Sequence, residues 1–105
     1  DTPLGKVYFC HGKNADVWKF AQSLGMSAVQ WHYHSSYGCK WYGNSLGLYF
    51  GLQCGCLIDP KALAFKYNKL QKARPVIGTA VIINGIPILE PMILDKSGKW
   101  IGKLL

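Results

Sequence analysis

The hydrophobic and polar positions of residues 5–12 (GKVYFCHG) alternate moderately, and the segment is rich in residues that favour β-structure. This pattern predicts a strand. Residues 13–26 carry apolar positions at helical spacing instead. Asn14 can cap this segment, Asp16 falls in its first turn, and Gly25 stands where a C-terminal glycine belongs. The repeated apolar positions are Val17, Ala21 and Leu24. We therefore expect a short amphipathic helix to follow the strand.

The middle of the chain, residues 27–59, is rich in aromatic residues and glycine and has little helical period. It predicts two strands, at residues 28–34 and 46–57, joined by irregular loops. Residues 59–73 predict a second helix, with Asp59 as its cap, Pro60 at the first position and basic residues toward the end.

The last third of the chain reads as strands separated by turns. We expect strands at residues 76–83, 91–95 and 100–105. They are joined through the turn sequences NGIP, which begins at Asn84, and DKSG, which begins at Asp95. The order of elements predicts an α+β fold in a single domain, residues 1–105, with one helix packed on an antiparallel sheet.

Composition supports a folded globule, because half of the 105 residues are hydrophobic and 13% are aromatic. No apolar run reaches the roughly 18 residues that a spanning helix needs. The net charge of +7 suits solubility or attraction to a polyanion such as RNA or an anionic membrane surface. Arg74 is the one arginine among twelve basic residues, which argues against bidentate phosphate recognition. The first ten residues, DTPLGKVYFC, have no basic head before an apolar stretch, and they predict a mature N-terminus left by cleavage of a leader.

The four cysteines are Cys10, Cys39, Cys54 and Cys56. An even count in a small chain favours two disulfides and a secreted protein. Because Cys54 and Cys56 are too close along the chain to pair comfortably with each other, each is expected to reach Cys10 or Cys39. A zinc site built from these thiols with His32 or His34 is the alternative, but the C-x-C spacing fits zinc motifs poorly. The third possibility is that the four cysteines are free thiols. We expect no metal and no cofactor.

The opening VYFC strand leads at once into a helix. The last third of the chain then contains three motifs in order: PV at residues 75–76, NGIP at 84–87 and EPMILDKSGKWIG at 90–102. In this order, the motifs resemble the small fungal guanyl-preferring ribonucleases. The resemblance covers the first quarter and the last third of the chain, and residues 30–70 do not align. It implies a microbial ribonuclease-like fold. It also places the catalytic glutamate at Ala73 and the phosphate-binding arginine at Met92, and the catalytic histidine would follow Leu105. Neither alanine nor methionine can accept a proton or pair with a phosphate, so the resemblance implies no enzymatic activity.

This chain also resembles a group in which the same fold, a Tyr-x-Cys motif and missing catalytic residues occur together, the RNase-like secreted effectors of cereal powdery mildews. That resemblance implies a secreted virulence protein, translocated into the host cell, that binds host plant proteins and is detected by an intracellular immune receptor. RNA is implied as a weak partner, and a membrane is not. In the family the motif cysteine pairs with one near the C-terminus, whereas no cysteine follows Cys56 here.

Several residues are candidates for contact with RNA or a partner protein. His32 and His34 would share a face of a strand, and a divergent secreted ribonuclease using both is the second hypothesis. The apolar stretch from Ala80 to Leu94 predicts a strand–loop–strand whose loop presents Ile86 and Ile88 to a partner. A small cationic toxin acting on membranes is the third hypothesis, weakened by the lack of a basic amphipathic helix with a wide apolar face. The candidate contact residues are His32, His34, Arg74, Ile86 and Ile88.

Overall fold

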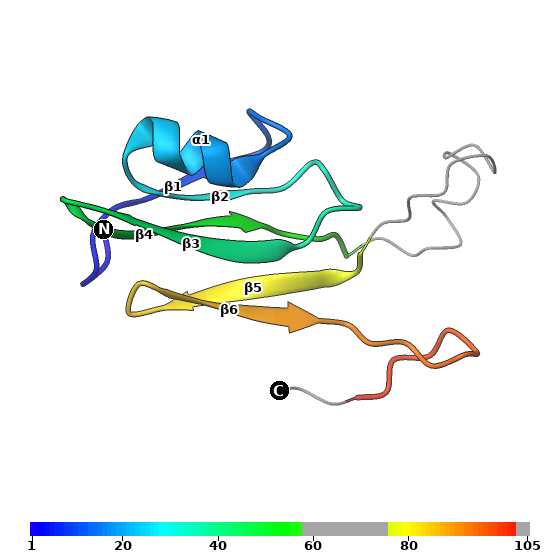
Figure 1. Cartoon of the computed structure of the whole chain (residues 1–105). Coiled ribbons are helices and arrows are strands. Elements are labelled where there is room, and N and C mark those ends of the chain that lie inside the picture. Colours follow the sequence, from blue (N-terminus) through cyan, green and yellow to red (C-terminus); the bar gives the residue numbers. More distant parts are fainter. Residues whose placement is uncertain (58–75, 103–105) are drawn as a thin grey trace.

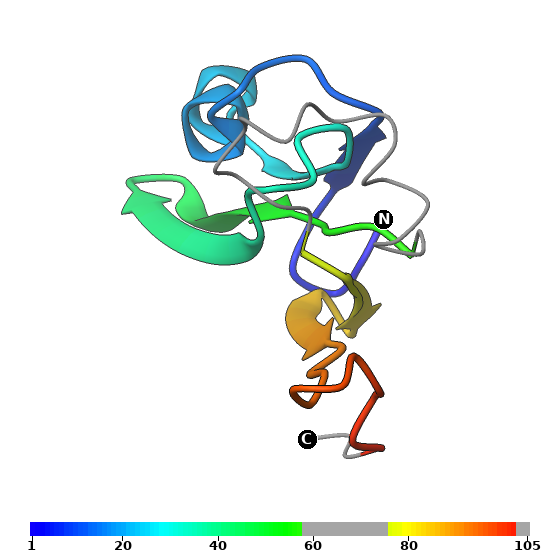
Figure 2. The same ribbon diagram turned by 90° about the vertical axis from the view of Figure 1, so that its right-hand side faces the viewer.

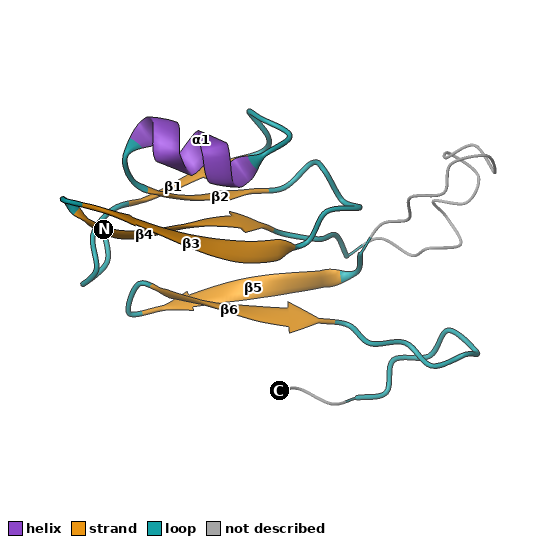
Figure 3. Cartoon of the chain, viewed as in Figure 1, coloured by secondary structure: helices purple, strands orange, loops and turns teal. Residues whose placement is uncertain are grey.

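The computed structural model describes residues 1–57 and 76–102, which form one helix and six strands (Figure 3). In chain order these are β1 (Val7–Cys10), α1 (Val17–Leu24), β2 (Ser27–Gln30), β3 (Gly38–Asn44), β4 (Gly47–Gln53), β5 (Gly78–Ile83) and β6 (Ile86–Pro91). The predicted α+β class, with one helix and mostly strands, is confirmed for this part of the chain. The helix predicted at residues 59–73 lies outside the described residues. Within them, no helix is long and apolar enough to cross a membrane.

Helix α1 forms within the predicted segment and ends at Gly25 as predicted, but it begins two residues later than expected. The Asp16 side chain caps it by accepting hydrogen bonds from the backbone N–H groups of Trp18 and Lys19, at 3.0 and 3.1 Å. Asn14, the expected cap, instead accepts a bond from Asp16 N at 3.0 Å and forms the turn before the helix. Gly25 ends the helix in the left-handed conformation, with φ of 66°.

The main sheet has four strands in the order β1-β2-β4-β3 (Figure 1). Strand β2 runs parallel to both β1 and β4, and only β3 and β4 pair antiparallel. The antiparallel sheet that we expected is therefore wrong for these strands, and the sheet is mixed. The reason is that α1 returns the chain to the end where β1 began, so β2 leaves in the same direction as β1.

Two strand boundaries in the middle of the chain also differ from the prediction. The strand expected at residues 28–34 ends at Gln30, because His32 has a left-handed backbone with φ of 78°. The strand expected at residues 46–57 is confirmed as β4, although it is shorter. Its partner β3 was expected to be irregular, yet it forms a seven-residue ladder closed by a tight turn in which Asn44 pairs with Gly47.

The second sheet is the antiparallel hairpin of β5 and β6. Asn84 and Gly85 make its two-residue turn with φ of 52° and 87°, as the NGIP sequence predicted. Pairing resumes directly at Ile86, and the second strand of the hairpin is Ile86–Pro91. The strand predicted at residues 91–95 is therefore wrong, because it was placed where β6 ends. The predicted turn at residues 95–98 is confirmed by the bond from Gly98 N to Asp95 O, 3.0 Å. Of the last predicted strand, a single bridge pairs Trp100 with Leu94 in the described residues.

The helix, the main sheet and the hairpin stack as three layers (Figures 1 and 2). The cluster between helix and sheet is built on Val17, Ala21 and Ala28. The cluster on the opposite face of the sheet is built on Val29, Phe50, Leu52 and Cys54, with Ala80, Ile82 and Leu89 of the hairpin packed against it. Gly51 of β4 allows α1 to lie close to the sheet, since a Cβ there would come within 2.8 Å of the Trp18 Cα.

Two buried glutamines connect the strands from within. Gln30 on β2 and Gln53 on β4 are 0% and 1% exposed, and Gln30 Nε2 donates to Gln53 Oε1 at 2.9 Å. Gln30 Nε2 also donates to Asn14 O at 2.6 Å, and its Oε1 accepts from Lys13 N at 3.3 Å. Gln53 Nε2 donates to Trp31 O at 3.2 Å and to the Cys54 carbonyl at 3.1 Å. The pair thus holds the loop before α1 and the loop after β2 against the sheet.

Replacing Gln30 by leucine should lower the free energy of unfolding by about 1–3 kcal/mol, because it leaves the Asn14 carbonyl and the Gln53 amide oxygen without their buried donor. Urea denaturation followed by far-UV circular dichroism measures the change. Gln22→Leu, on the exposed face of α1, is the matched control and should change stability little. Equal stabilities of the two variants would contradict a structural role for the glutamine pair.

Candidate functional site

The hairpin presents an apolar face to solvent. Val81 pairs with Ile88 and Ile83 pairs with Ile86, so these four side chains share one face. Their exposed fractions are 47, 39, 54 and 51% in that order. The other face of the hairpin is the one packed on the main sheet. Single exposed aliphatic residues are ordinary, whereas four on adjacent positions of one sheet face form a patch of the kind that binds partners.

Polar residues bound this patch along the hairpin. At one end the next pair in register is Thr79 with Glu90, and at the other end lies the Asn84–Gly85 turn, where Thr2 and Leu4 pack against Gly85. The sequence predicted exposure of Ile86 and Ile88 from a loop. They are exposed, but they belong to β6, and the two residues that complete the patch come from β5. An apolar centre with a polar margin is the usual composition of a protein interface.

A second cluster lies where β1 and β2 end side by side. His11 Nε2 and His32 Nδ1 are 3.0 Å apart in a hydrogen bond, and both residues are exposed. The Phe9 and Trp31 rings stack beside each other, with centroids 6.3 Å apart. Trp31 N donates to His11 O at 2.9 Å, which holds the two segments together. The sequence analysis identified His32 as a candidate but expected it beside His34, whereas its partner in the structure is His11.

The expected pairing of His32 with His34 on one strand is wrong. Strand β2 ends before either residue, and His34 N donates to His32 O at 3.0 Å in a tight turn. His34 Nδ1 is buried and has no hydrogen-bond partner among the described residues. The pairing of His11 with His32 depends on the parallel direction of β1 and β2, which brings the ends of both strands to the same edge. The antiparallel sheet expected from the sequence therefore hid it.

The histidine pair is poorly arranged for ribonuclease chemistry. A general acid and a general base must contact opposite oxygens of the phosphate that they act on, so the phosphate has to fit between them. Here the two imidazoles are hydrogen-bonded directly to each other. The described residues also bring no cluster of three or more histidine, cysteine, aspartate or glutamate side chains together.

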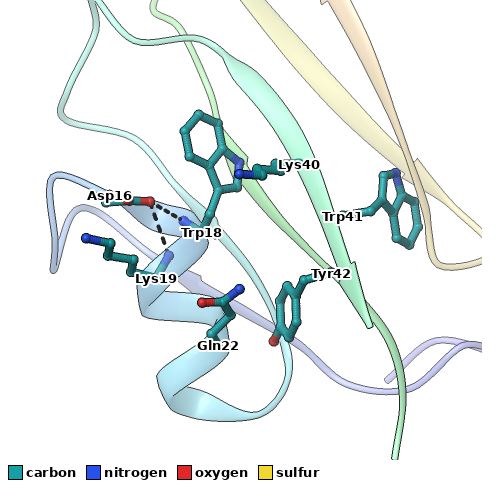
Figure 4. A pocket seen from close by; sticks show the side chains of 7 residues that line it. All are labelled: Asp16, Trp18, Lys19, Gln22, Lys40, Trp41 and Tyr42. Carbon is teal, nitrogen blue, oxygen red and sulfur yellow. Dashed lines mark hydrogen bonds between the residues drawn. The ribbon is translucent and has the colours of Figure 1, made fainter. Parts of the chain in front are cut away.

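A cavity of about 160 Å³ lies between α1 and β3 (Figure 4). Lys40 Nζ lies 5.9 Å from the centroid of the Trp18 ring, a cation–π contact. Trp18 Nε1 is buried without a hydrogen-bond partner in the described residues. Ligand pockets usually measure roughly 300 Å³ or more, so this cavity is too small to be the principal site. The lining residues are Asp16, Trp18, Lys19, Gln22, Lys40, Trp41 and Tyr42.

No disulfide joins the four cysteines, all of which lie in the described part of the chain. The structure therefore has four free cysteines and none of the expected disulfides. Cys39 and Cys54 pack into the apolar cluster between the sheet and the hairpin. Burial raises the pKa of the Cys54 thiol to about 11 and also raises the pKa of Cys39. Cys10 also has a raised pKa because of burial, although Lys13 opposes the shift.

The positions matched to the ribonuclease catalytic set are only partly described. Met92 follows β6, is 36% exposed, and its N–H donates to Ile77 O at 2.9 Å. Ala73 and Arg74 lie outside the described residues. The expectation that Ala73 and Met92 face one cleft therefore stays a prediction.

Differential alkylation should find four thiols in denatured protein, with Cys54 protected in the native protein. At pH 8 a thiol of pKa about 11 is thiolate in about one molecule in a thousand, and only the thiolate reacts. Iodoacetamide labelling followed by peptide mass spectrometry measures this, and the more exposed Cys10 is the internal control. Labelling of Cys54 should rise with pH. A disulfide-linked peptide, or labelling of Cys54 as fast as Cys10, would contradict the thiol state described above.

Comparison with known proteins yields no relative. No protein-family model, curated protein or solved structure matches the chain. The hairpin face and the resemblance carried by the sequence motifs therefore supply the basis for a function.

Proposed function

We propose that this protein is a non-catalytic binding protein that recognises a partner protein through the outer face of the β5–β6 hairpin. The observation that carries the proposal is the set of four neighbouring aliphatic side chains, Val81, Ile83, Ile86 and Ile88, each 39–54% exposed. Burying such a face is worth about 25 cal/mol per Å² of apolar area, so a partner that covers it gains affinity from the hydrophobic effect.

The prolines of β6 favour binding to the face of the hairpin over pairing along the edge that β6 forms. Ile83 and Ile86 flank the two-residue turn and form a hydrogen-bonded pair. Along an antiparallel ladder such pairs alternate with pairs whose backbone N–H and C=O groups point away from the partner strand. The bond from Met92 N to Ile77 O agrees with this alternation, because these two residues stand two positions beyond the pair of Thr79 with Glu90. Pro87 and Pro91 therefore stand where a backbone nitrogen points away from β5, and proline has no N–H to offer an added strand there.

The sequence resemblance supplies the class of partner. We propose a secreted fungal effector with an inactive ribonuclease-like fold that enters the host cell, binds host plant proteins and is detected by an intracellular immune receptor. Support comes from the strand containing Tyr8 and Cys10, which leads into a helix packed on a sheet. The parallel pairing of β1 with β2 is the departure from the expected sheet. The net charge of +7 favours a partner with an acidic margin around its apolar centre.

The binding proposal is preferred to the ribonuclease hypothesis because the histidines that would act as acid and base are not arranged around a phosphate. It is preferred to a membrane toxin because the exposed apolar patch is on a hairpin stacked on the sheet, while helix α1 buries Val17 and Ala21 against the sheet.

Changing Ile83 and Ile88 together to lysine should abolish capture of specific proteins from plant leaf extract without lowering thermal stability, since both side chains are already solvent-exposed. Capture is quantified by mass spectrometry, and the affinity of each purified partner is then measured by calorimetry. We expect it to fall by at least about tenfold.

The matched control is the Leu46→Lys and Leu48→Lys double variant. It adds the same charge at two exposed leucines (83 and 61%) around the β3–β4 turn. It should retain the partners that the hairpin variant loses. Equal loss from both variants would show that added charge alone weakens binding, and unchanged capture by the hairpin variant would overturn the proposal.

A further inference from the structure

The histidine pair at the ends of β1 and β2 is not used by the proposed function, and its geometry suggests a separate property. His11 Nε2 and His32 Nδ1 are 3.0 Å apart, and the ring planes are inclined at 62°. Both residues are exposed, so an ion in solution can reach them. In a neutral pair, one imidazole donates its N–H and the other offers a nitrogen lone pair.

The position of His32 depends on an unusual local backbone. Its φ of 78° is left-handed, a conformation that non-glycine residues seldom adopt. The His32 side chain lies over Gly12, where an added Cβ would come within 2.8 Å of the His32 Cβ. Gly12 therefore provides the space that lets the two rings approach each other. Strain of this kind persists only where the surrounding structure fixes it.

The buried glutamine pair fixes both segments that carry the histidines. Gln30 bonds to Lys13 N and Asn14 O, just after His11, while Gln53 bonds to Trp31 O, just before His32. Because Gln30 and Gln53 are bonded to each other, the two segments are anchored to one rigid point in the sheet. Ligands held in this way lose little conformational freedom when they bind an ion.

We propose that His11 and His32 bind a divalent late first-row metal ion of the Ni²⁺ type in two adjacent coordination positions. Two metal–nitrogen bonds of about 2.1 Å at a right angle place the nitrogens about 3.0 Å apart, whereas tetrahedral angles need a wider separation. The ion replaces the shared hydrogen bond. The ring that donated this bond changes tautomer by exchange with solvent, so that its other nitrogen carries the proton and both imidazoles stay neutral. A small rotation of the exposed rings then turns both lone pairs toward the metal.

The described residues supply no third ligand, so water completes the coordination and the site is open. Lys13 lies close along the chain and lowers the affinity by its positive charge. Binding weakens in acidic buffer, where protons compete for the imidazole nitrogens. This property is independent of the hairpin face, and either proposal can fail alone.

Titration of the untagged, reduced protein with Ni²⁺, followed by calorimetry and by NMR, tests the site. We expect one ion per chain, with paramagnetic broadening centred on the amides of Gly12 and Tyr33. His11→Gln and His32→Gln should each weaken binding by at least about tenfold and remove the broadening, as loss of a metal ligand requires.

His34→Gln is the matched control, because His34 is in the same loop but is not part of the pair. Together with Cys10→Ser, it should leave Ni²⁺ binding unchanged. Circular dichroism of each variant checks that it is folded. The proposal is overturned if the wild type does not bind, if His34→Gln or Cys10→Ser weakens binding as much as His11→Gln, or if broadening is centred elsewhere in the chain.

Discussion

The hydrogen bond between the side-chain amides of Gln30 and Gln53 is the interaction on which the rest of the structure depends. It joins the two central strands, β2 and β4, and its remaining donors and acceptors reach the loops on either side. In a buried site each of these polar groups would cost about 1–3 kcal/mol if left unpaired, so the network has few alternative arrangements. Apolar packing alone would hold the layers together without fixing where the loops lie.

The position of the two loops that follow β1 and β2 determines which side chains are exposed there. One anchored loop contains His11 and the other contains His32, and they meet at the edge where β1 and β2 end. On the face of the sheet opposite the helix, the hairpin covers Phe50 and Leu52 with one of its own faces and leaves the other uncovered. The molecule therefore presents two distinct features, a polar pair of rings and an apolar strand face, on one framework.

The sequence predicts local structure correctly where a few neighbouring residues decide it. The Gly25 helix end and the turns at Asn84–Gly85 and 95–98 are of this kind. The predicted strand pairing is partly wrong, because the register and direction of paired strands depend on residues far apart in the chain. The parallel direction of β2 and the partnership of His11 with His32 both follow from the crossover through α1. The buried role of Gln30 and Gln53 also had no local signal, since glutamine is usually exposed.

Hydrogen exchange of the glutamine side-chain amides, followed by NMR, tests the central claim most directly. If the Gln30–Gln53 network anchors the sheet and both loops, the side-chain N–H₂ signals of these two residues should persist in D₂O long after that of exposed Gln22 has vanished. Exchange of all three at the same rate would show that the buried pair opens freely. It would contradict the account of how the histidine loops and the sheet are held together.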